Sequence, residues 1–336
     1  MQNTASAAPL RTTDVVILIP VFNDWGSLAR LISEIDVALG SARLLGLLVV
    51  VDDGSTLAVT DDLRNQPYQN LRAVELLRLR CNLGHQRAIA VGMSHITRTG
   101  VGAHALVVMD GDGEDRPEDI PRLLNALRGS SGDCPSRVVF AGRTRRLESA
   151  RFRLMYNLYR LVHWLLTGIS VRVGNFSVLT PDAMARLVIA PDMWNHYAAA
   201  VFRSRVPFSI LPLPRGKRYL GQSHMSYSSL VAHGLSAIAV FGELVGARLI
   251  ILLSGVVVVA VSLLIVAVLL RLFSNQAISG WATNAVGLLI VFTMQALLAL
   301  TILALIVLGD RSHAKIIPLR DAELFIESAT RLSSLP

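Results

Sequence analysis

Short apolar runs alternate with segments of helical periodicity over the first two thirds of the chain. Each run is short and mostly apolar, which predicts a buried strand. Helices are predicted at about 27–39 and 84–96. Strands that alternate with helices favour an α/β fold with a mostly parallel sheet and crossover helices. The predicted strands are Val15–Ile19, Leu47–Val51, Leu71–Leu79, Ala105–Val108, Val138–Ala141, Val171–Thr180 and Val206–Leu213.

The last third of the chain carries two much longer apolar segments. Between Arg248 and Arg271 lie about 22 residues without a charged side chain, enough to cross ~30 Å of hydrocarbon at about 1.5 Å per residue. Ala285–Gly309 is a second segment of this kind. We therefore expect an α/β domain over residues 14–225 followed by a two-helix transmembrane hairpin over residues 248–309. A hairpin buried inside a soluble protein is the alternative.

Three further segments complete the expected organisation. Residues 226–247 carry an apolar stripe that predicts an amphipathic helix lying on the bilayer surface. Residues 1–13 lack the apolar core of a signal peptide and are expected to be a disordered lead. Residues 310–336 are expected to be a cytoplasmic tail.

The charges that flank the two apolar segments indicate how the hairpin is oriented. Arg248 stands before the first segment, and Arg311, Lys315 and Arg320 follow the second. The connector between the segments has no charged residue beyond Arg271 at its edge. The positive-inside rule therefore predicts a two-pass membrane protein with its α/β domain and both termini in the cytoplasm.

Composition narrows the classes of partner. The formal net charge is +8, and nearly all of the basic side chains are arginine, because lysine occurs only at 217 and 315. In a chain with membrane segments, such a charge favours anionic lipid headgroups or phosphorylated substrates over nucleic acid. Two cysteines are too few for a disulfide framework and favour a reducing compartment.

The strand Ala105–Val108 ends in a run of acidic residues and glycines. Asp110 and Asp112 are two positions apart, and the intervening glycine permits a turn that brings both carboxylates to one cation. Such ligands suit Mg²⁺ or Mn²⁺ bridging a diphosphate. A solvated acidic turn is the simpler alternative. A calcium loop of the EF-hand type fits less well, because Asp115 and Pro121 stand where that loop needs glycine and glutamate.

A second strand, Leu47–Val51, also ends in acidic residues, Asp52 and Asp53. Open α/β sheets bind ligands at the carboxyl ends of their parallel strands. No Gly-x-Gly-x-x-Gly follows the first strand, which argues against a dinucleotide site. Two acidic strand ends instead favour a nucleotide held through its base or ribose and through a metal-bound diphosphate.

Further short motifs follow the predicted strands along the chain. A proline, an aromatic residue and an acid follow the first strand, and an Asn-x-Gly pair precedes the helix at 84–96. A late basic segment contains Arg-x-x-Gly-x-Ser. In chain order the motif residues are Pro20, Phe22, Asp24, Asp52, Asp53, Asn82, Gly84, Asp110, Asp112, Glu114, Arg218, Gly221, Ser223 and His224.

This order of motifs resembles that of the family 2 inverting glycosyltransferases with the GT-A fold, a Rossmann-like sheet domain. The resemblance covers about residues 14–250, and it is strongest to the branch of dolichol-phosphate mannose synthase and the bacterial polyprenyl-phosphate glycosyltransferases. The paired membrane helices resemble those of the bacterial enzymes.

The resemblance implies a role for each motif. Asp53 is expected to recognise the base, Asp110 and Asp112 to bind Mg²⁺ or Mn²⁺, and Asp112 and Arg218 to be catalytic. Glu114 replaces a glutamine that the family carries, and His224 replaces a lysine. The residues expected to bind the nucleotide sugar are Pro20, Phe22, Asp24, Asp53, Asn82, Gly84, Asp110, Glu114 and Ser223.

The acceptor is less directly indicated. The family often has an aspartate before and an arginine after the residue equivalent to Phe176, whereas this chain has Val171–Asn175 before it and Ser177 after. A phosphate acceptor is already anionic and needs no general base, so these departures favour polyprenyl phosphate.

Basic residues beyond the strand Val138–Ala141 are candidates for holding that phosphate. They are Arg143, Arg145 and Arg146. A solvated basic loop is the alternative for all three. Residues 151–168 mix aromatic and basic side chains at helical spacing, which suits either a packed amphipathic helix or a membrane-surface role. His85 and His163 have no partner visible in the sequence and are interpreted as structural.

The function predicted from these features is transfer of a sugar from a nucleoside-diphosphate sugar to a polyprenyl phosphate on the cytoplasmic leaflet. A homo-oligomer is compatible with the sequence. Three rivals are a processive polysaccharide synthase, a transferase with a hydroxyl acceptor, and a catalytically silent nucleotide-sugar-binding membrane protein. The first is disfavoured because no Gln-x-x-Arg-Trp occurs and two spans are too few for a polymer channel.

Overall fold

The computed structural model describes residues 13–60, 63, 66–129, 135–143, 164–168, 173–219, 234–273, 280–312 and 314–334. Its chain forms two compact units. The first contains the sheet and comprises residues 1–150, 171–240 and 315–336. The second comprises residues 151–170 and 241–314 and contains the two long apolar helices.

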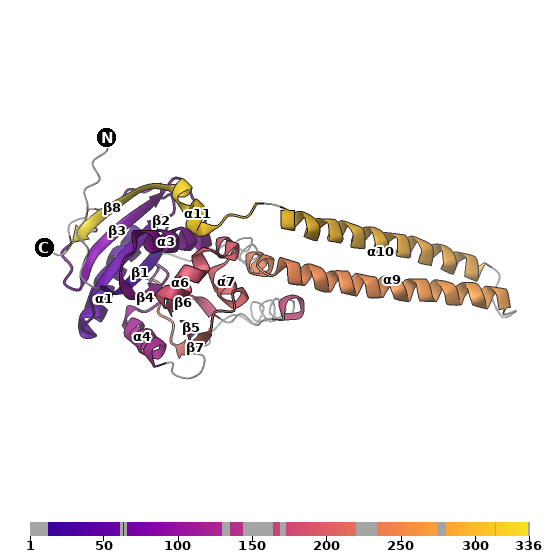
Figure 1. Ribbon diagram of the computed structural model, residues 1–336, viewed down its shortest axis with the longest axis horizontal. Coiled ribbons are helices and arrows are strands. Elements are labelled where there is room, and N and C mark those ends of the chain that lie inside the picture. The colour runs from indigo at the N-terminus through magenta and orange to yellow at the C-terminus, as the bar shows by residue number, and fades with distance from the viewer. Residues whose placement is uncertain are drawn as a thin grey trace. The chain divides into compact units, whose positions relative to one another are not determined.

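The first unit is built on an eight-stranded sheet of order β7-β5-β6-β4-β1-β2-β3-β8 (Figure 1). The central strands β4, β1, β2 and β3 are mutually parallel, and so are β5 and β7, whereas β6 and β8 run antiparallel to their neighbours. The predicted mostly parallel sheet is confirmed. The strands are β1 (Thr13–Val21), β2 (Gly46–Asp52), β3 (Leu71–Leu79), β4 (Ala103–Val108), β5 (Val138–Arg143), β6 (Val173–Leu179), β7 (Phe208–Leu213) and β8 (Ile326–Ser334).

Helices cover both faces of this sheet. Along β1, alternate side chains enter different cores: Val15 packs with α1 and α4, whereas Val16 packs with α3, α6 and α7. Both faces are therefore buried, which explains why the central strands are continuous apolar runs rather than alternating ones. The elements are α1 (Trp25–Ser41), α3 (His85–Thr99), η1 (Pro117–Asp119), α4 (Ile120–Arg128), α6 (Pro181–Val188), η2 (Pro191–Trp194), α7 (Tyr197–Arg203), α11 (Pro318–Asp321) and η3 (Ala322–Phe325).

The second unit is dominated by α9 (Gly242–Phe273) and α10 (Trp281–Ser312), which lie side by side as an antiparallel hairpin (Figure 1). Small residues line their contact: Gly246 faces Val307, and Ala260 and Ala267 are buried. Only 6% of the most apolar window of either helix is buried. A hairpin buried in a soluble core is therefore excluded, and both helices are candidate membrane spans.

The boundaries of the hairpin differ from those expected. The first long helix begins at Gly242, six residues before Arg248. It therefore includes the end of the segment expected to lie on the bilayer surface, of which residues 226–233 fall outside the described part. The second unit also includes residues 151–170, of which only 164–168 are described. The guanidinium of Arg248 donates hydrogen bonds to the carbonyls of Leu165 (3.1 Å) and Leu166 (2.9 Å) in that segment.

The segment expected to be a cytoplasmic tail folds back into the sheet. Strand β8 pairs antiparallel with β3, with Leu77 opposite Ala329. Just before it, Phe325 stacks on Trp194, with ring centroids 4.9 Å apart. The run is too polar to signal a strand because it lies at the sheet edge, where one side of the strand remains unpaired.

We expect removal of residues 326–336 to destabilise the sheet domain. Without β8, the backbone N–H and C=O groups along one side of β3 would lose their hydrogen-bond partners. Each kcal/mol lost should lower Tm by about 2–4 °C in a domain of this size. Thermal unfolding of the purified full chain and of the truncated chain would measure the shift. As a control, Ser328→Ala should leave Tm within about 1 °C, since surface substitutions usually change stability little. Equal Tm for the full and truncated chains would contradict a structural role for β8.

Candidate active site

The predicted polar motifs meet at one edge of the sheet. Strands β4, β1 and β2 are adjacent and parallel, with Leu18 opposite Val108 and Pro20 opposite Val51. Their carboxyl ends therefore lie side by side, and the loops that follow them carry the aromatic and acidic residues named above. This is the edge at which open α/β sheets bind ligands.

The loop after β1 is fixed by Asn23, which has a positive φ of 55°. Its side-chain oxygen accepts hydrogen bonds from the backbone N–H groups of Thr56 (2.9 Å) and Leu57 (3.0 Å). The loops after β1 and β2 are thereby joined. Phe22 is 48% exposed, so an apolar ring is presented at this edge. Pro20 is buried within β1, and Asp24 immediately precedes α1.

Asp53 organises the neighbouring loop. Its two carboxylate oxygens accept hydrogen bonds from the backbone N–H groups of Leu83 (2.7 Å) and Gly84 (2.9 Å), within the Asn-x-Gly motif. The side chain is buried, and burial raises the pKa of Asp53 although the two N–H groups oppose the shift. Recognition of a base by Asp53 stays a prediction. What the contacts establish is that this carboxylate holds the backbone of Leu83 and Gly84 in place.

The acidic loop after β4 folds upon itself. Asp115 accepts a hydrogen bond from the backbone N–H of Asp110 at 2.9 Å, and Asp112 accepts one from the N–H of Glu114 at 2.9 Å. Backbone groups and side chains of the loop thus satisfy one another. The carboxylates of Asp110 and Asp112 stay partly exposed, at 23% and 17%.

Asp110 contacts two residues from other elements. Its Oδ1 lies 3.0 Å from Nε2 of His85, the first residue of α3, and accepts a hydrogen bond from Nδ2 of Asn175 at 3.2 Å. Asn175 in β6 in turn accepts a hydrogen bond from Gln86 at 3.1 Å, and Gln86 accepts one from the backbone N–H of Tyr197 at 2.7 Å. A buried polar network therefore extends from Asp110 through β6 and α3 to the start of α7.

The protonation of His85 depends on these acidic neighbours. Burial disfavours the charged imidazolium, but the negative charges of Asp110, Asp115 and Asp53 outweigh burial and raise the pKa of His85. The imidazole is therefore biased toward the cationic form wherever those carboxylates are ionised and carry no other cation.

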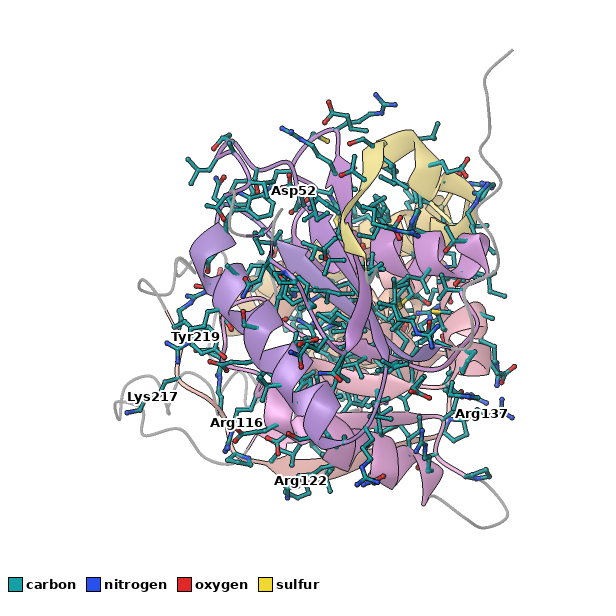
Figure 2. All side chains as sticks on the ribbon, turned by 90° about the vertical axis from the view of Figure 1, so that its left-hand side faces the viewer. Asp52, Arg116, Arg122, Arg137, Lys217 and Tyr219 are labelled. Carbon is teal, nitrogen blue, oxygen red and sulfur yellow. The ribbon has the colours of Figure 1, made fainter. Side chains whose placement is uncertain are left out.

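A segment after β7 returns to the acidic loop and supplies two arginines. Arg218 lies 3.2 Å from Oδ2 of Asp112, and Arg215 pairs with Glu114. A backbone contact fixes this segment against the acidic loop, since the N–H of Gly216 donates a hydrogen bond to the carbonyl of Glu114 at 2.8 Å. Tyr219 donates a hydrogen bond to Glu34. Figure 2 shows Lys217, Tyr219 and Arg116 along one side of this unit.

These residues fit a divalent cation held jointly with a ligand. Within the described part of the chain, no three His, Cys, Asp or Glu side chains converge as a preformed metal site. Two partly exposed carboxylates, Asp110 beside His85 and Asp112 beside Arg218, match the way Mg²⁺ is bound through one or two carboxylates plus substrate phosphates. Asp110 and Asp112 would hold that ion, and the ion would neutralise charge on a diphosphate.

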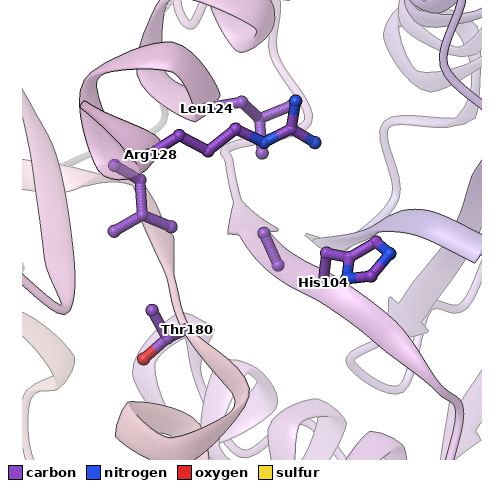
Figure 3. Close-up of a pocket in the computed structure, with 6 residues that line it drawn as sticks. His104, Leu124, Arg128 and Thr180 are labelled. Atoms are coloured by element: carbon purple, nitrogen blue, oxygen red, sulfur yellow. The ribbon is translucent and has the colours of Figure 1, made fainter. Parts of the chain in front are cut away.

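The structure describes only part of the remaining predicted site. Arg143 ends β5, opposite Leu213, but its side chain is outside the described part. Arg145, Arg146 and Ser223 also fall outside it. The pocket in Figure 3, of about 430 Å³, is lined by His104, Ala105, Leu124, Leu127, Arg128 and Thr180. His104 and Ala105 stand at the amino end of β4, away from Asp110, so this pocket is not part of the site.

Comparison with known families agrees with this arrangement. The family model "Glycosyl transferase family 2" matches residues 16–187, about half of the chain, from β1 into α6. The matched segment includes the loops that carry Asp53, Asp110 and Asp112. The chain belongs to glycosyl transferase family 2.

Two curated relatives of this family 2 chain act on lipid phosphates by name. Dodecaprenyl-phosphate galacturonate synthase from Rhizobium johnstonii is 29% identical over 35% of this chain and 34% of its own. Undecaprenyl-phosphate 4-deoxy-4-formamido-L-arabinose transferase from an Enterobacter species is 35% identical over 33% of this chain and 32% of its own. The match thus spans about a third of each relative's length.

Solved structures similar to this family 2 chain are distant. Glucosyl-3-phosphoglycerate synthase from Mycobacterium tuberculosis, in complex with Mn²⁺ and UDP, covers 70% of this chain and 79% of its own at 13% identity and a TM-score of 0.47. Mannosyl-3-phosphoglycerate synthase from Rubrobacter xylanophilus covers 69% and 73% at 16% identity and a TM-score of 0.46.

Sequence reasoning missed three residues that the fold of this family 2 chain brings to the site. His85 was interpreted as structural, yet it contacts Asp110. Asn175 and Arg215 were given no role. The sequence does contain a signal that places His85 near the site, because this residue begins a helix directly after the Asn-x-Gly motif. Asn175 could not be found this way, since 65 residues separate it from Asp110.

We expect Gly54→Ala to damage the loops of this family 2 site. Gly54 has a φ of +70°, and an added Cβ would lie 2.7 Å from backbone atoms of Cys81 and Asn82. Gly100→Ala is a matched control, because its φ of +63° is also positive but its Cβ would meet nothing within 4 Å. Gly100→Ala should cost about 1–2 kcal/mol, and Gly54→Ala clearly more, by chemical unfolding. Equal losses would show that the close approach of the two loops is absent.

Proposed function

We propose that this chain transfers a sugar from a nucleoside-diphosphate sugar to a polyprenyl phosphate, as a metal-dependent enzyme with inversion at the anomeric carbon. The observation that carries the proposal is the pairing of Asp112 with Arg218 beside Asp110 at the carboxyl edge of the sheet. Family membership supports the transferase class, and the names of the two curated relatives support the lipid-phosphate acceptor.

The proposed donor is supported by the loops that hydrogen bonds join at this edge of the sheet. Phe22 offers an exposed ring at the edge where Asp53 holds the Asn82–Gly84 turn, so a nucleoside has an apolar surface and backbone groups to bind. Its diphosphate would extend toward Asp110 and Asp112. A divalent ion bound there supplies charge stabilisation for the leaving diphosphate.

Arg218 has the position and charge to act on the same leaving group. A guanidinium is planar and permanently charged, and it can donate two hydrogen bonds to phosphate oxygens. With Asp112 holding a divalent cation, Arg218 would exchange this carboxylate for an oxygen of the diphosphate. The bond from the anomeric carbon to the diphosphate would break as an acceptor oxygen attacks from the opposite side.

The acceptor half is supported by charge and by the membrane segments. An ionised phosphate monoester attacks without surrendering a proton, and no carboxylate stands directly before Phe176 to serve as a base. Arg143, Arg145 and Arg146 are our candidates for binding that phosphate. A hydroxyl acceptor on a glycolipid is the second candidate, and it would need a base from another part of the chain.

The connectivity of the chain supports one orientation of the hairpin. The chain leaves the sheet unit after Val240 and re-enters it at Lys315, after two candidate spans. Both ends of a two-span hairpin joined to one folded unit must emerge on that unit's side of the membrane. With arginines and lysine flanking those ends, we place the sheet domain and the chain's ends in the cytoplasm, where the cytoplasmic leaflet supplies the acceptor.

Asp112→Ala should reduce turnover by at least about 10²–10³-fold, the scale of losing one stabilising contact in the transition state. Release of the nucleoside diphosphate from membranes containing the protein would measure it. Glu118→Ala is the control, because Glu118 is an exposed partner of Arg116 in the helix that follows the loop, and it should keep wild-type activity. Near wild-type turnover by the Asp112 variant would refute the metal assignment.

Asn175→Ala should weaken apparent metal affinity by about 10–100-fold, the usual cost of losing a residue that orients a ligand. The substitution removes the hydrogen bond that fixes Asp110. Activity against Mg²⁺ or Mn²⁺ concentration measures the change. Ser177→Ala is matched to it, because Ser177 lies in the same strand and its hydroxyl bonds to Tyr197 at 2.7 Å and to the backbone carbonyl of Asn175 at 2.8 Å, but not to Asp110. If both variants need the same extra metal, Asn175 does not position Asp110.

A panel of labelled nucleotide sugars, incubated with membranes containing the full chain, tests the reaction itself. We expect label in the lipid extract, released by mild acid, because a sugar attached through its anomeric carbon to phosphate is acid-labile. Label in a mild-acid-stable glycolipid would instead indicate a hydroxyl acceptor. No transfer from any donor would favour the catalytically silent alternative.

A further inference from the structure

The second long helix carries one polar side chain in an unusual position. Gln295 lies near the middle of the candidate span Thr283–Gly309, and it is exposed. The side chains on its face of α10 are apolar and exposed as well, including Leu288 (73%) and Ile302 (49%). The contact with α9 uses a different face, on which Thr293 and Ala296 are buried.

Three hydroxyl side chains of the spans are satisfied within their own helix. The hydroxyls of Ser262, Thr293 and Thr301 each donate to the carbonyl four residues earlier, at 2.7–2.9 Å. Among the described residues, the amide of Gln295 has no such partner. A carboxamide has two donor hydrogens and a carbonyl acceptor, so the unmet bonding capacity is large.

Gln295 lies too deep in the candidate span for its side chain to reach water at either membrane surface. It is separated from Thr283 by about 18 Å of helix and from Gly309 by about 21 Å, at about 1.5 Å per residue. A glutamine side chain cannot reach across half of a ~30 Å hydrocarbon layer. An unpaired amide in hydrocarbon is costly, and glutamine commonly bonds across helices in membranes.

We propose that Gln295 marks a self-association surface, at which α10 of one copy packs against α10 of a second copy. All copies insert in the same direction, so Gln295 of each lies at the same depth. A two-fold axis along the membrane normal then places the two amides opposite each other, where each donates to the carbonyl of the other. Because a carboxamide carries both donors and an acceptor, two facing glutamine side chains can satisfy each other.

The occupant is a second copy rather than lipid because acyl chains have neither donors nor acceptors. Flanking residues on this face, Leu288 and Ile302 among them, lie seven residues from Gln295 and so extend the same stripe along the helix. This surface is independent of the transferase chemistry, and it holds whether or not the proposed reaction does.

The test uses the full chain, fluorescently labelled and reconstituted in liposomes over a range of lipid dilutions. Single-molecule photobleaching gives the fraction of pairs. Gln295→Leu should weaken association by about threefold to twentyfold, the range for one interhelical hydrogen bond. Gln295→Asn should restore part of it, and Thr301→Val, which removes an internally bonded hydroxyl, should not change it. A wild-type chain that is monomeric at every dilution, or a Gln295→Leu curve equal to wild type, overturns the proposal.

Cross-linking locates the surface independently. In a chain with Cys81 and Cys134 changed to serine, Ile302→Cys should form disulfide-linked pairs on oxidation. Leu297→Cys, exposed on another face of α10, should not. Equal cross-linking at both positions would contradict a surface centred on Gln295.

Discussion

The parallel pairing of β1 with β2 and β4 is the constraint on which the site depends. With Leu18 opposite Val108 and Pro20 opposite Val51, three strands end together at one edge. These strands are buried on both faces, so a slip of one residue would send every side chain to the wrong core. Core packing therefore fixes the register of these strands, and the register in turn sets where each loop begins.

Fixed strand ends do not by themselves order the loops, which contain little regular structure. Side chains that accept hydrogen bonds from backbone N–H groups take that role: Asn23 joins the first two loops, Asp53 holds the third, and Asp115 closes the acidic one. Bonds to charged acceptors are stronger than neutral ones. Three acidic or amide side chains are thus used as scaffolding, and they are distinct from Asp110 and Asp112, the carboxylates that we propose to hold a cation.

The sheet unit is discontinuous in sequence, and this explains how a membrane hairpin and a transferase domain share one chain. The hairpin is an insertion between Val240 and Lys315, after which the chain adds β8 to the sheet edge. Arg78 lies 3.2 Å from Glu327 of that strand and 3.9 Å from Asp52, so the last strand is linked to the motif beside Asp53. An edge strand covered in this way no longer exposes its unpaired backbone groups.

Sequence by itself determined the elements whose signal is local. Apolar runs such as Val15–Ile19 and Leu47–Val51 identified the central strands because burial on both faces requires continuous hydrophobicity. The acidic ends of the runs Leu47–Val51 and Ala105–Val108 located Asp53, Asp110 and Asp112, and charge-free length located the two long helices.

Only the tertiary structure decided which residues meet across long separations. Asn175 and His85 reach Asp110 through the strand order, and Arg215 reaches Glu114 by the return of its segment over the acidic loop. Residues 326–334 form a strand because β3 offers an unpaired edge, not because their own pattern requires one. Such contacts depend on partners distant in the chain, and periodicity along one segment carries no information about a partner that lies elsewhere.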